Sequence, residues 1–405
     1  MNITLFNGGR GASSIIKSLK NYNNINISSI VNAYDDGKST GEIRSFFNML
    51  GPSDLRKVQS IFLDTKNHLY NYNINFFNYR LPKNITNSLA KEEIIKLFSH
   101  ISNDKNIFGI DNFIFSKMKK FINIFLNKLD YLESEKSRKF NFNDCSIMNC
   151  LYAGAYTYFN DDLIKTIEYF SYLFKIESKI LPNSIENLNL IALRENGDML
   201  SNEADIVGLR SNVKIYKIFL IKSIDKIDLN YLSKISFNEK LKYLDKLSFN
   251  VQISNNLKKI INDSDIIIYS PGTQHSSLLP TYMTNTIGDL ISNNKNSLKV
   301  FISNIGADYE NPVYIASDYL YNSFKYLNLS SMKKNLLKDY FNFLLINEPL
   351  IRNDSNKVKF DNKIIETGID FQRINLEDTK NLGHHDGNKV VELIFKKYNQ
   401  LNIQN

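Results

Sequence analysis

Asn7-Gly8-Gly9-Arg10-Gly11-Ala12-Ser13-Ser14, close to the start of the chain, is the segment that most clearly indicates the fold. An apolar run at residues 3–6 precedes it, and apolar residues recur at helical spacing over residues 15–19, which predicts a strand-to-helix turn. Glycines let the backbone approach an anion closely, and the unpaired amides at a helix start attract negative charge. We therefore expect this turn to bind a phosphate through Gly8, Gly9, Arg10 and Gly11.

A second turn, Tyr34-Asp35-Asp36-Gly37-Lys38-Ser39-Thr40-Gly41, follows another apolar run at residues 25–33. The run predicts a second strand parallel to the first, so that both turns would emerge at neighbouring carboxyl ends of one sheet. In open α/β sheets that edge is the usual ligand site. We expect Asp35, Lys38 and Ser39 to contact a substrate there.

Three blocks in this region carry a resemblance to a known family: Gly8-Gly9-Arg10-Gly11, then Asp35-Asp36-Gly37-Lys38-Ser39-Thr40-Gly41-Glu42-Ile43-Arg44, then Gly51-Pro52-Ser53-Asp54-Leu55-Arg56. They resemble the GGTG, ADDGGSSGRLR and PGDIRN blocks of the superfamily that joins 2-phospho-L-lactate transferase to the bacterial gluconeogenesis factor, a nucleotide-sugar-binding protein. Their order and spacing match the second branch better. The resemblance implies a Rossmann-like sheet and a nucleotide or nucleotide-sugar ligand, such as GDP or a UDP-sugar.

A later block, Pro271-Gly272-Thr273-Gln274-His275-Ser276-Ser277-Leu278-Leu279-Pro280, extends the resemblance because it is similar to the family's GPGSLYTSxxP loop. Ser270 replaces a glycine, and His275 stands at an aromatic position. A glycine- and hydroxyl-bearing loop after a buried strand suits a second phosphate or sugar site. The nucleotide-binding set therefore also includes Pro271, Gly272, Thr273, Ser277 and, at the end of a strand over residues 300–304, Asn304.

Two side chains of these blocks leave alternatives open. Asn149 lies in a segment similar to the family's HSLGNLLLAG, and it could bind the nucleotide or be a helix cap or a satisfied polar group of the core. His275 could be a general acid or base, a phosphate ligand, or a polar substitute for the usual aromatic residue. We predict nucleotide binding for Asn149 and substrate binding for His275.

Asp35, Asp36 and Asp54 are the only clustered carboxylates among these loops. Carboxylates beside phosphates repel them unless a cation intervenes, which favours Mg²⁺. We predict that Asp36 and Asp54 are metal ligands and catalytic residues, and that Arg44 and Arg56 bind the substrate and neutralise phosphate charge. The alternative for the Asp35-Asp36 pair is turn formation, since Asp-Gly is a turn dipeptide.

Composition limits the class of protein. The chain has 405 residues, 43% of them hydrophobic, and so can bury a large core. Its net charge of +8 is spread along the chain without an arginine cluster, which argues against nucleic acid as a partner. Two cysteines are too few for a disulfide framework, and no signal peptide or membrane-spanning run is evident, so we expect a cytoplasmic protein without membrane contact.

These signals predict a doubly wound α/β fold with a mostly parallel sheet, organised as a single domain over residues 1–405. Helical periodicity over residues 91–130 predicts a helical insertion at residues 65–140, with its aromatic stripe in the core. An Asn-Gly hairpin signal predicts a small antiparallel β appendage at residues 180–220.

Three functions follow from different classes. The first is a transferase resembling 2-phospho-L-lactate transferase, in which a small-molecule acceptor's hydroxyl attacks the phosphorus of a nucleotide-activated donor. The second is a non-catalytic UDP-sugar-binding regulator of cell-wall or carbon metabolism, as the gluconeogenesis-factor branch implies. The third, nucleic-acid binding, rests on charge alone. We place the enzyme slightly ahead of the regulator, and either function is compatible with a homodimer.

Overall fold

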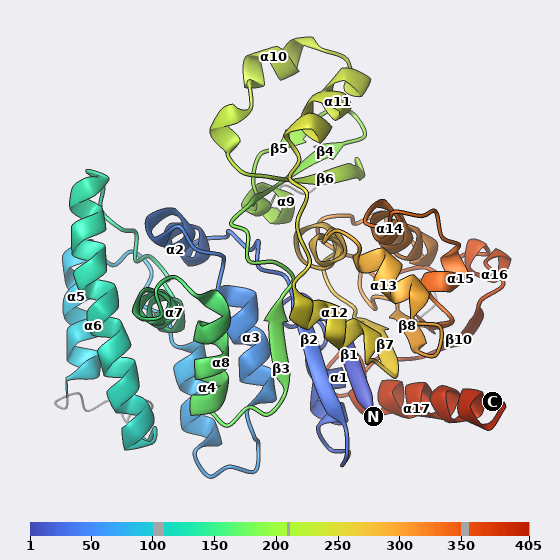
Figure 1. Cartoon of the computed structure of the whole chain (residues 1–405), viewed down its shortest axis with the longest axis horizontal. Helices are drawn as coiled ribbons and strands as arrows, with labels where there is room; N and C mark the ends of the chain where they lie inside the picture. The colour runs from blue at the N-terminus through green and yellow to red at the C-terminus, as the bar shows by residue number, and fades with distance from the viewer. Residues whose placement is uncertain (100–108, 209–210, 350–355, 405) are drawn as a thin grey trace. The chain divides into compact units, whose positions relative to one another are not determined.

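The computed structural model describes residues 1–99, 109–208, 211–349 and 356–404 (Figure 1). The chain forms two compact units, which are described separately. Unit 1 consists of Met1–Tyr34 and Leu181–Asn405, and unit 2 of Asp35–Ile180.

The main sheet has seven strands in the order β10-β9-β8-β7-β1-β2-β3. Neighbours from β10 to β2 pair in parallel. Buried residues fill β1, β7, β8 and β9 almost completely, as expected for strands covered on both faces. The strands are β1 (Asn2–Asn7), β2 (Asn26–Val31), β3 (Lys179–Pro182), β7 (Ile266–Tyr269), β8 (Leu298–Ile302), β9 (Phe343–Asn347) and β10 (Asp370–Ile374).

The sheet of unit 1 is wound in both directions from β1 and β7. Helix α1 (Ser13–Leu19) connects β1 to β2, whereas α13 (Ile287–Asn293) connects β7 to β8, which lies on the other side. Right-handed crossovers in opposite directions place these two helices on opposite faces. Helix α17 (Gly387–Gln404) packs against α1, and α13 packs against α12 (Asn255–Asn262), α14 (Ala316–Leu329) and α15 (Leu337–Tyr340). Short helices complete the unit: η2 (Gln274–Leu278), η3 (Leu279–Tyr282) and α16 (Lys363–Glu366).

A small antiparallel sheet, ordered β5-β4-β6, forms a separate layer within unit 1. Its core is a cluster of leucine, isoleucine and phenylalanine side chains that includes Leu193, Phe219 and Leu244. The elements of this part are β4 (Asn189–Arg194), β5 (Met199–Leu200), α9 (Glu203–Gly208), β6 (Ile215–Ile221), η1 (Ile224–Lys226), α10 (Leu229–Lys234) and α11 (Phe237–Leu247).

Unit 2 is helical, apart from its share of β3. Its central helix α7 (Ile147–Tyr158) is buried over most of its length and contacts α2, α3, α4, α6 and α8. Gly154 allows the close approach of α6, because a Cβ there would lie 2.0 Å from the carbonyl oxygen of Phe121. The other helices are α2 (Ser39–Phe47), α3 (Ser53–Phe62), α4 (Tyr70–Asn78), α5 (Asn87–Phe98), α6 (Asn112–Glu135) and α8 (Leu163–Leu173).

The structure confirms the predicted α/β class, with a mostly parallel sheet and a small antiparallel one. The helical part runs beyond the predicted insertion at residues 65–140, since unit 2 spans Asp35–Ile180. Two pieces of the predicted segments, residues 100–108 of the insertion and 209–210 of the appendage, lie outside the described residues.

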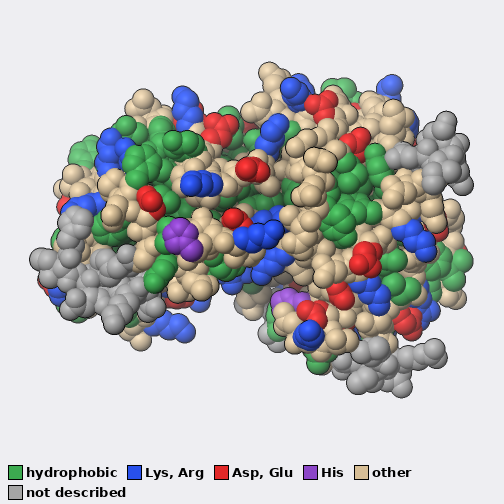
Figure 2. All heavy atoms as spheres, turned by 90° about the horizontal axis from the view of Figure 1, so that it is seen from below, with side chains coloured by type: hydrophobic (Ala, Val, Ile, Leu, Met, Phe, Trp, Pro, Cys, Tyr) green, Lys and Arg blue, Asp and Glu red, His purple; other side chains and the backbone are tan. Residues whose placement is uncertain are grey.

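On the face that Figure 2 shows, Lys and Arg side chains are interspersed with Asp and Glu side chains. Among the described residues, none of the helices is both long enough and apolar enough to cross a membrane.

Candidate active site

The turn after β1 and the loop after β7 lie at the point where the sheet reverses its winding direction. β1 and β7 are neighbours, and the chain continues from them to opposite edges of the sheet. In open α/β sheets this switch point is where ligands bind, outside the carboxyl ends of the strands. Unit 1 therefore presents the first glycine turn and the Pro271 loop side by side at the expected ligand edge.

The two loops pack so closely that glycine is required for contact between them. A Cβ at Gly8 would lie 2.6 Å from the Cβ of Ser277, and one at Gly11 would lie 2.1 Å from the carbonyl oxygen of Pro271. Arg10 is exposed, and its carbonyl oxygen accepts hydrogen bonds from Ser13. Helix α1 begins after Ala12 without any side-chain cap. The close backbone packing of the two loops therefore accounts for the shape of the first turn.

Side-chain hydrogen bonds hold the glycine segment of the Pro271 loop. The carboxamide of Asn304 donates to the carbonyl oxygen of Gly272 and accepts from its amide, both at 2.9 Å. Gly272 has a φ of +153°, which favours glycine. The hydroxyls of Thr273 and Ser277 lie 2.9 Å apart. Asn304 thus serves the loop's conformation, while Thr273 and Ser277 remain partly exposed hydroxyl groups.

His275 lies in the interior, with none of its surface exposed. Its Nδ1 is 2.8 Å from the side-chain nitrogen Nδ2 of Asn311. Burial lowers the pKa of the imidazole to about 3. The side chain is a neutral, buried group of the core, which fits the alternative of a polar substitute for an aromatic residue. Substrate binding by His275 stays a prediction.

Sequence reasoning missed two carboxylates that reach the start of η2. Asp308 Oδ2 accepts from the amide of Gln274 at 2.9 Å, and Glu310 Oε2 accepts from the amide of His275 at 2.7 Å. Both side chains are buried. Burial raises the pKa of Asp308 to about 6, and burial together with Asp308 raises the pKa of Glu310. The local pattern of residues 308–311 does not indicate that these carboxylates accept hydrogen bonds from η2.

Unit 2 contains a charge cluster formed by a buried carboxylate, Asp54, and two half-buried groups, Asp35 and Lys57. Asp54 lies in the first turn of α3 and pairs with the ammonium of Lys57 at 2.8 Å. Burial and the nearby Asp54 raise the pKa of Asp35, while Asp54 raises the pKa of Lys57. Two neighbouring carboxylates with one lysine make a site that can exchange protons and attract a cation.

Asn149 and Arg56 form a second buried group in unit 2. Arg56 Nε donates to Asn149 Oδ1 at 2.8 Å, and the Asn149 amide group donates to the hydroxyls of Ser39 and Ser53, each at 3.1 Å. Arg56 also donates to the carbonyl oxygen of Phe77 at 3.0 Å. These bonds give Asn149 and Ser39 a positioning role between α7, α2 and α3, and ligand contact by them stays a prediction.

The remaining predicted residues of unit 2 flank the same loops. Arg44 Nη1 reaches the carbonyl oxygen of Asp35 at 3.4 Å. The backbone of Asp36 lies against Gly41, where a Cβ would be 2.4 Å from the Asp36 carbonyl oxygen. Lys38 is exposed and lies 3.6 Å from the carboxylate of Asp144.

The predicted site residues are thus divided between the two units. Unit 1 holds the neutral loop residues Gly8, Gly9, Gly11, Pro271, Gly272, Thr273, Ser277 and Asn304, together with Arg10 and His275; unit 2 holds Asp35, Asp36, Lys38, Ser39, Arg44, Asp54, Arg56 and Asn149.

Metal binding can be judged from the donor set. Among the described residues, no three His, Cys, Asp or Glu side chains gather in a group that could hold a metal ion. Mg²⁺ needs fewer protein ligands, because one or two carboxylates combine with waters and substrate phosphates. The neighbouring Asp35 and Asp54 fit that pattern, although Asp54 would share its charge between the ion and Lys57.

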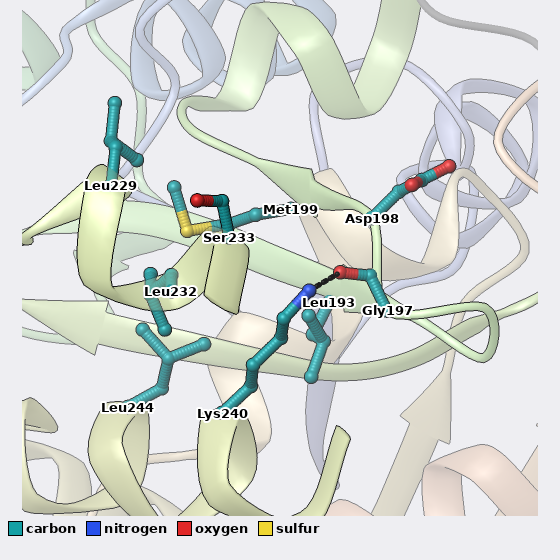
Figure 3. Close-up of a pocket in the computed structure, with 9 residues that line it drawn as sticks. All are labelled: Leu193, Gly197, Asp198, Met199, Leu229, Leu232, Ser233, Lys240 and Leu244. Carbon is teal, nitrogen blue, oxygen red and sulfur yellow. Dashed lines mark hydrogen bonds between the residues drawn. The ribbon is translucent and has the colours of Figure 1, made fainter. Parts of the chain in front are cut away.

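A cavity of about 230 Å³ lies in the small-sheet part of unit 1, between the hairpin and helices α10 and α11 (Figure 3). Leucine side chains 193, 232 and 244 form much of its wall, and Lys240 donates to the carbonyl oxygen of Gly197 at 2.8 Å. Its lining includes none of the predicted site residues.

Comparisons with known proteins agree with this architecture. A protein named "Putative gluconeogenesis factor" from Thermotoga maritima is 23% identical, covering 94% of this chain and 88% of that one. One of the same name from Aquifex aeolicus is 22% identical, covering 98% and 96%. A crystal structure of a UPF0052 family member from Bacillus halodurans has a TM-score of 0.66 at 19% identity, covering 97% and 98%. The model of the family 2-phospho-L-lactate transferase CofD matches residues 3–382, and the chain belongs to this family.

Proposed function

We propose that this protein transfers a phosphoryl-linked group from a nucleotide-activated donor to the hydroxyl of a small acceptor. The observation that carries the proposal is the meeting of two glycine loops at the switch point between β1 and β7. Such a crevice, with a glycine turn opening a helix, suits the phosphates of a nucleotide. Membership of the transferase family supports the same reaction class.

The charged cluster of unit 2 offers the groups that the reaction needs. The acceptor oxygen forms a bond to phosphorus, the bond from phosphorus to the nucleoside monophosphate breaks, and the hydroxyl proton passes to a carboxylate. Asp35 suits that last step, because its raised pKa makes it a better proton acceptor than an ordinary aspartate. We propose that Arg44 and Arg56 neutralise phosphate charge, as the resemblance of their sequence blocks to the family implies.

A bound Mg²⁺ would lower the cost of charge at the transferring phosphate. We propose Asp54 as one ligand and Asp36 as the second, which leaves Asp35 to accept the proton. The sequence motif supports this choice.

The test is a product assay. The protein is incubated with Mg²⁺ and a panel of nucleotide-activated donors and hydroxy-acid acceptors, and released nucleoside monophosphate is quantified. We expect release with at least one pair, and less release in Asp35→Asn. As a matched control, Asp130→Asn removes an exposed aspartate that pairs with Lys91 in the same unit, and should leave release unchanged. A donor that binds without any release, under all acceptors, would argue against a transferase.

The second candidate is a non-catalytic nucleotide-sugar-binding regulator, favoured by the gluconeogenesis-factor name of the relatives from Thermotoga maritima and Aquifex aeolicus. It predicts thermal stabilisation by a UDP-sugar without turnover. The same donor panel, read first by melting temperature and then by product release, separates the two functions.

A further inference from the structure

The Pro271 loop contains an anion site that the chain itself fills. Three successive amides at the start of η2 point at carboxylates: that of Gln274 at Asp308, and those of His275 and Ser276 at Glu310. The Ser276 amide is 3.2 Å from each Glu310 oxygen. Consecutive backbone amides of this kind form a nest suited to a bound anion.

Both carboxylates are buried without a basic partner. Glu310 has no exposed surface and Asp308 is 5% exposed. No lysine or arginine among the described residues forms an ion pair with either of them, and the nearest imidazole nitrogen, Nδ1 of His275, is 3.9 Å from Glu310. The backbone amides are therefore the main compensation for burying these groups, which makes the contact strongly dependent on geometry.

The loop that these carboxylates hold is the one that faces the first glycine turn. Ser277 lies directly against Gly8, and Pro271 against Gly11. Thr273 and Ser277 share a hydrogen bond and are partly exposed at this edge. A shift of the η2 amides would therefore move the hydroxyls that a ligand on the glycine turn would meet.

We propose that Asp308 and Glu310 are positioning residues for the nucleotide site, acting as internal hydrogen-bond acceptors that fix the Pro271 loop. The proposal rests on the proposed function. It also assigns the two loops different tasks: an external phosphate binds at the first turn, and the η2 amides are reserved for Glu310 and Asp308.

The experiment compares Glu310→Gln with Glu377→Gln. The glutamine at 310 keeps the size of the side chain but turns an amide donor toward backbone N–H groups. Glu377 is the matched control, because it is also buried in unit 1 and also accepts a backbone amide, from Gly383, away from the loop. Hydrogen exchange of residues 274–278 and calorimetric affinity for the nucleotide found in the donor panel are measured in both variants.

We expect Glu310→Gln to speed exchange at residues 274–278 and to weaken nucleotide binding at least tenfold, while Glu377→Gln does neither. Action through the loop is tested by a double-mutant cycle with Ser277→Ala. In the Ser277→Ala background, Glu310→Gln should weaken nucleotide binding by less than threefold. If Glu310→Gln acted through a general loss of stability, the free-energy effects of the two substitutions on nucleotide binding would be additive.

Two outcomes would overturn the proposal alone: wild-type nucleotide affinity in Glu310→Gln, or additive losses in the cycle. If the wild-type protein binds none of the nucleotides, the proposed function fails and this proposal with it, so the two failures are distinguishable. Should Glu310→Gln not fold, Glu310→Asp is measured in its place. That variant keeps the charge but shortens its reach, and unchanged affinity would again contradict the positioning role.

Discussion

The turn after β1 and the loop after β7 look alike in sequence but differ in how their amides are used. Helix α1 has no side-chain cap at its start, whereas the first amides of η2 are occupied by Asp308 and Glu310. Both loops carry glycine and hydroxyl residues, and both were predicted to bind phosphate. The difference shows that a glycine-rich loop need not hold an external anion, because carboxylates of the chain itself can occupy its amides.

The comparison extends to the way each unit neutralises a buried carboxylate. Glu310 of unit 1 relies on backbone amides, and burial raises its pKa. Glu133 of unit 2 is equally buried but accepts from Lys91, Asn87, Lys139 and the amide of Phe140, and its pKa falls to about 2. Lysine partners stabilise the charged form, which amides achieve less completely here.

The largest expected effect concerns the first turn. Gly11→Val should cost about 3 kcal/mol or more, because its side chain would meet the Pro271 backbone, which cannot move without shifting β7's loop. Gly306→Ala is the control, since its Cβ would meet nothing closer than 3.6 Å. Urea denaturation measures both. A Gly11→Val protein as stable as the control would show that the two loops do not pack as described.

A smaller effect is expected at Glu133. Glu133→Gln should lower the free energy of unfolding by about 2 kcal/mol at pH 7, because it removes the common partner of two lysines. Guanidinium would screen such pairs, so urea is the better denaturant. Loss of less than about 0.5 kcal/mol would place Glu133 with ordinary surface ion pairs.

Two opposite pH dependences would sharpen the comparison of the two carboxylates further. Glu133 has a folded pKa below its unfolded value, so its stabilisation is complete above about 4.5 and is lost as the pH falls toward about 2. Asp308 has a folded pKa raised from 3.8 to about 6, so its contribution is present below 3.8 and is lost as the pH rises through 6. Each slope is at most about 1.4 kcal/mol per pH unit.

Unfolding free energies measured across this pH range in Glu133→Gln and Asp308→Asn check both signs. The first variant should lose the acid-side slope and keep the slope near pH 6, and the second should do the reverse. Identical pH profiles in the two variants would remove the distinction between lysine-compensated and amide-compensated carboxylates.

The sheet and its glycine loops could be predicted from the sequence because local residue patterns indicate them. The apolar runs that became β1, β2 and β7 end in glycine turns, and a parallel sheet brings such ends to one edge. The same reasoning placed Asn304 at the end of β8 and predicted that it binds the nucleotide. In the structure its carboxamide forms hydrogen bonds with the backbone of Gly272.

The features that were not predicted depend on contacts between residues that are distant in sequence. Glu310 binds amides that lie more than thirty residues earlier, and no periodicity in its own loop shows where it points. His275 occupies an aromatic position of the family motif, and its full burial fits that position, but a polar residue gave no sign of a core location. A local signal was also overlooked. Ser236 and Glu239 form a capping box at the start of α11, which the Ser-x-x-Glu pattern could have revealed.

The decisive experiment compares the effect of Asp54→Asn on turnover with its effect on nucleotide affinity. It tests whether the protein transfers a phosphoryl-linked group with the help of Asp54. If Asp54 acts on the transferring phosphate, kcat for nucleoside monophosphate release should fall about a hundredfold or more, while the donor's Kd changes less than about threefold. Asp130→Asn should leave both unchanged. A donor that binds to the wild-type protein with no release, or release that persists unaltered in Asp54→Asn, would contradict the account.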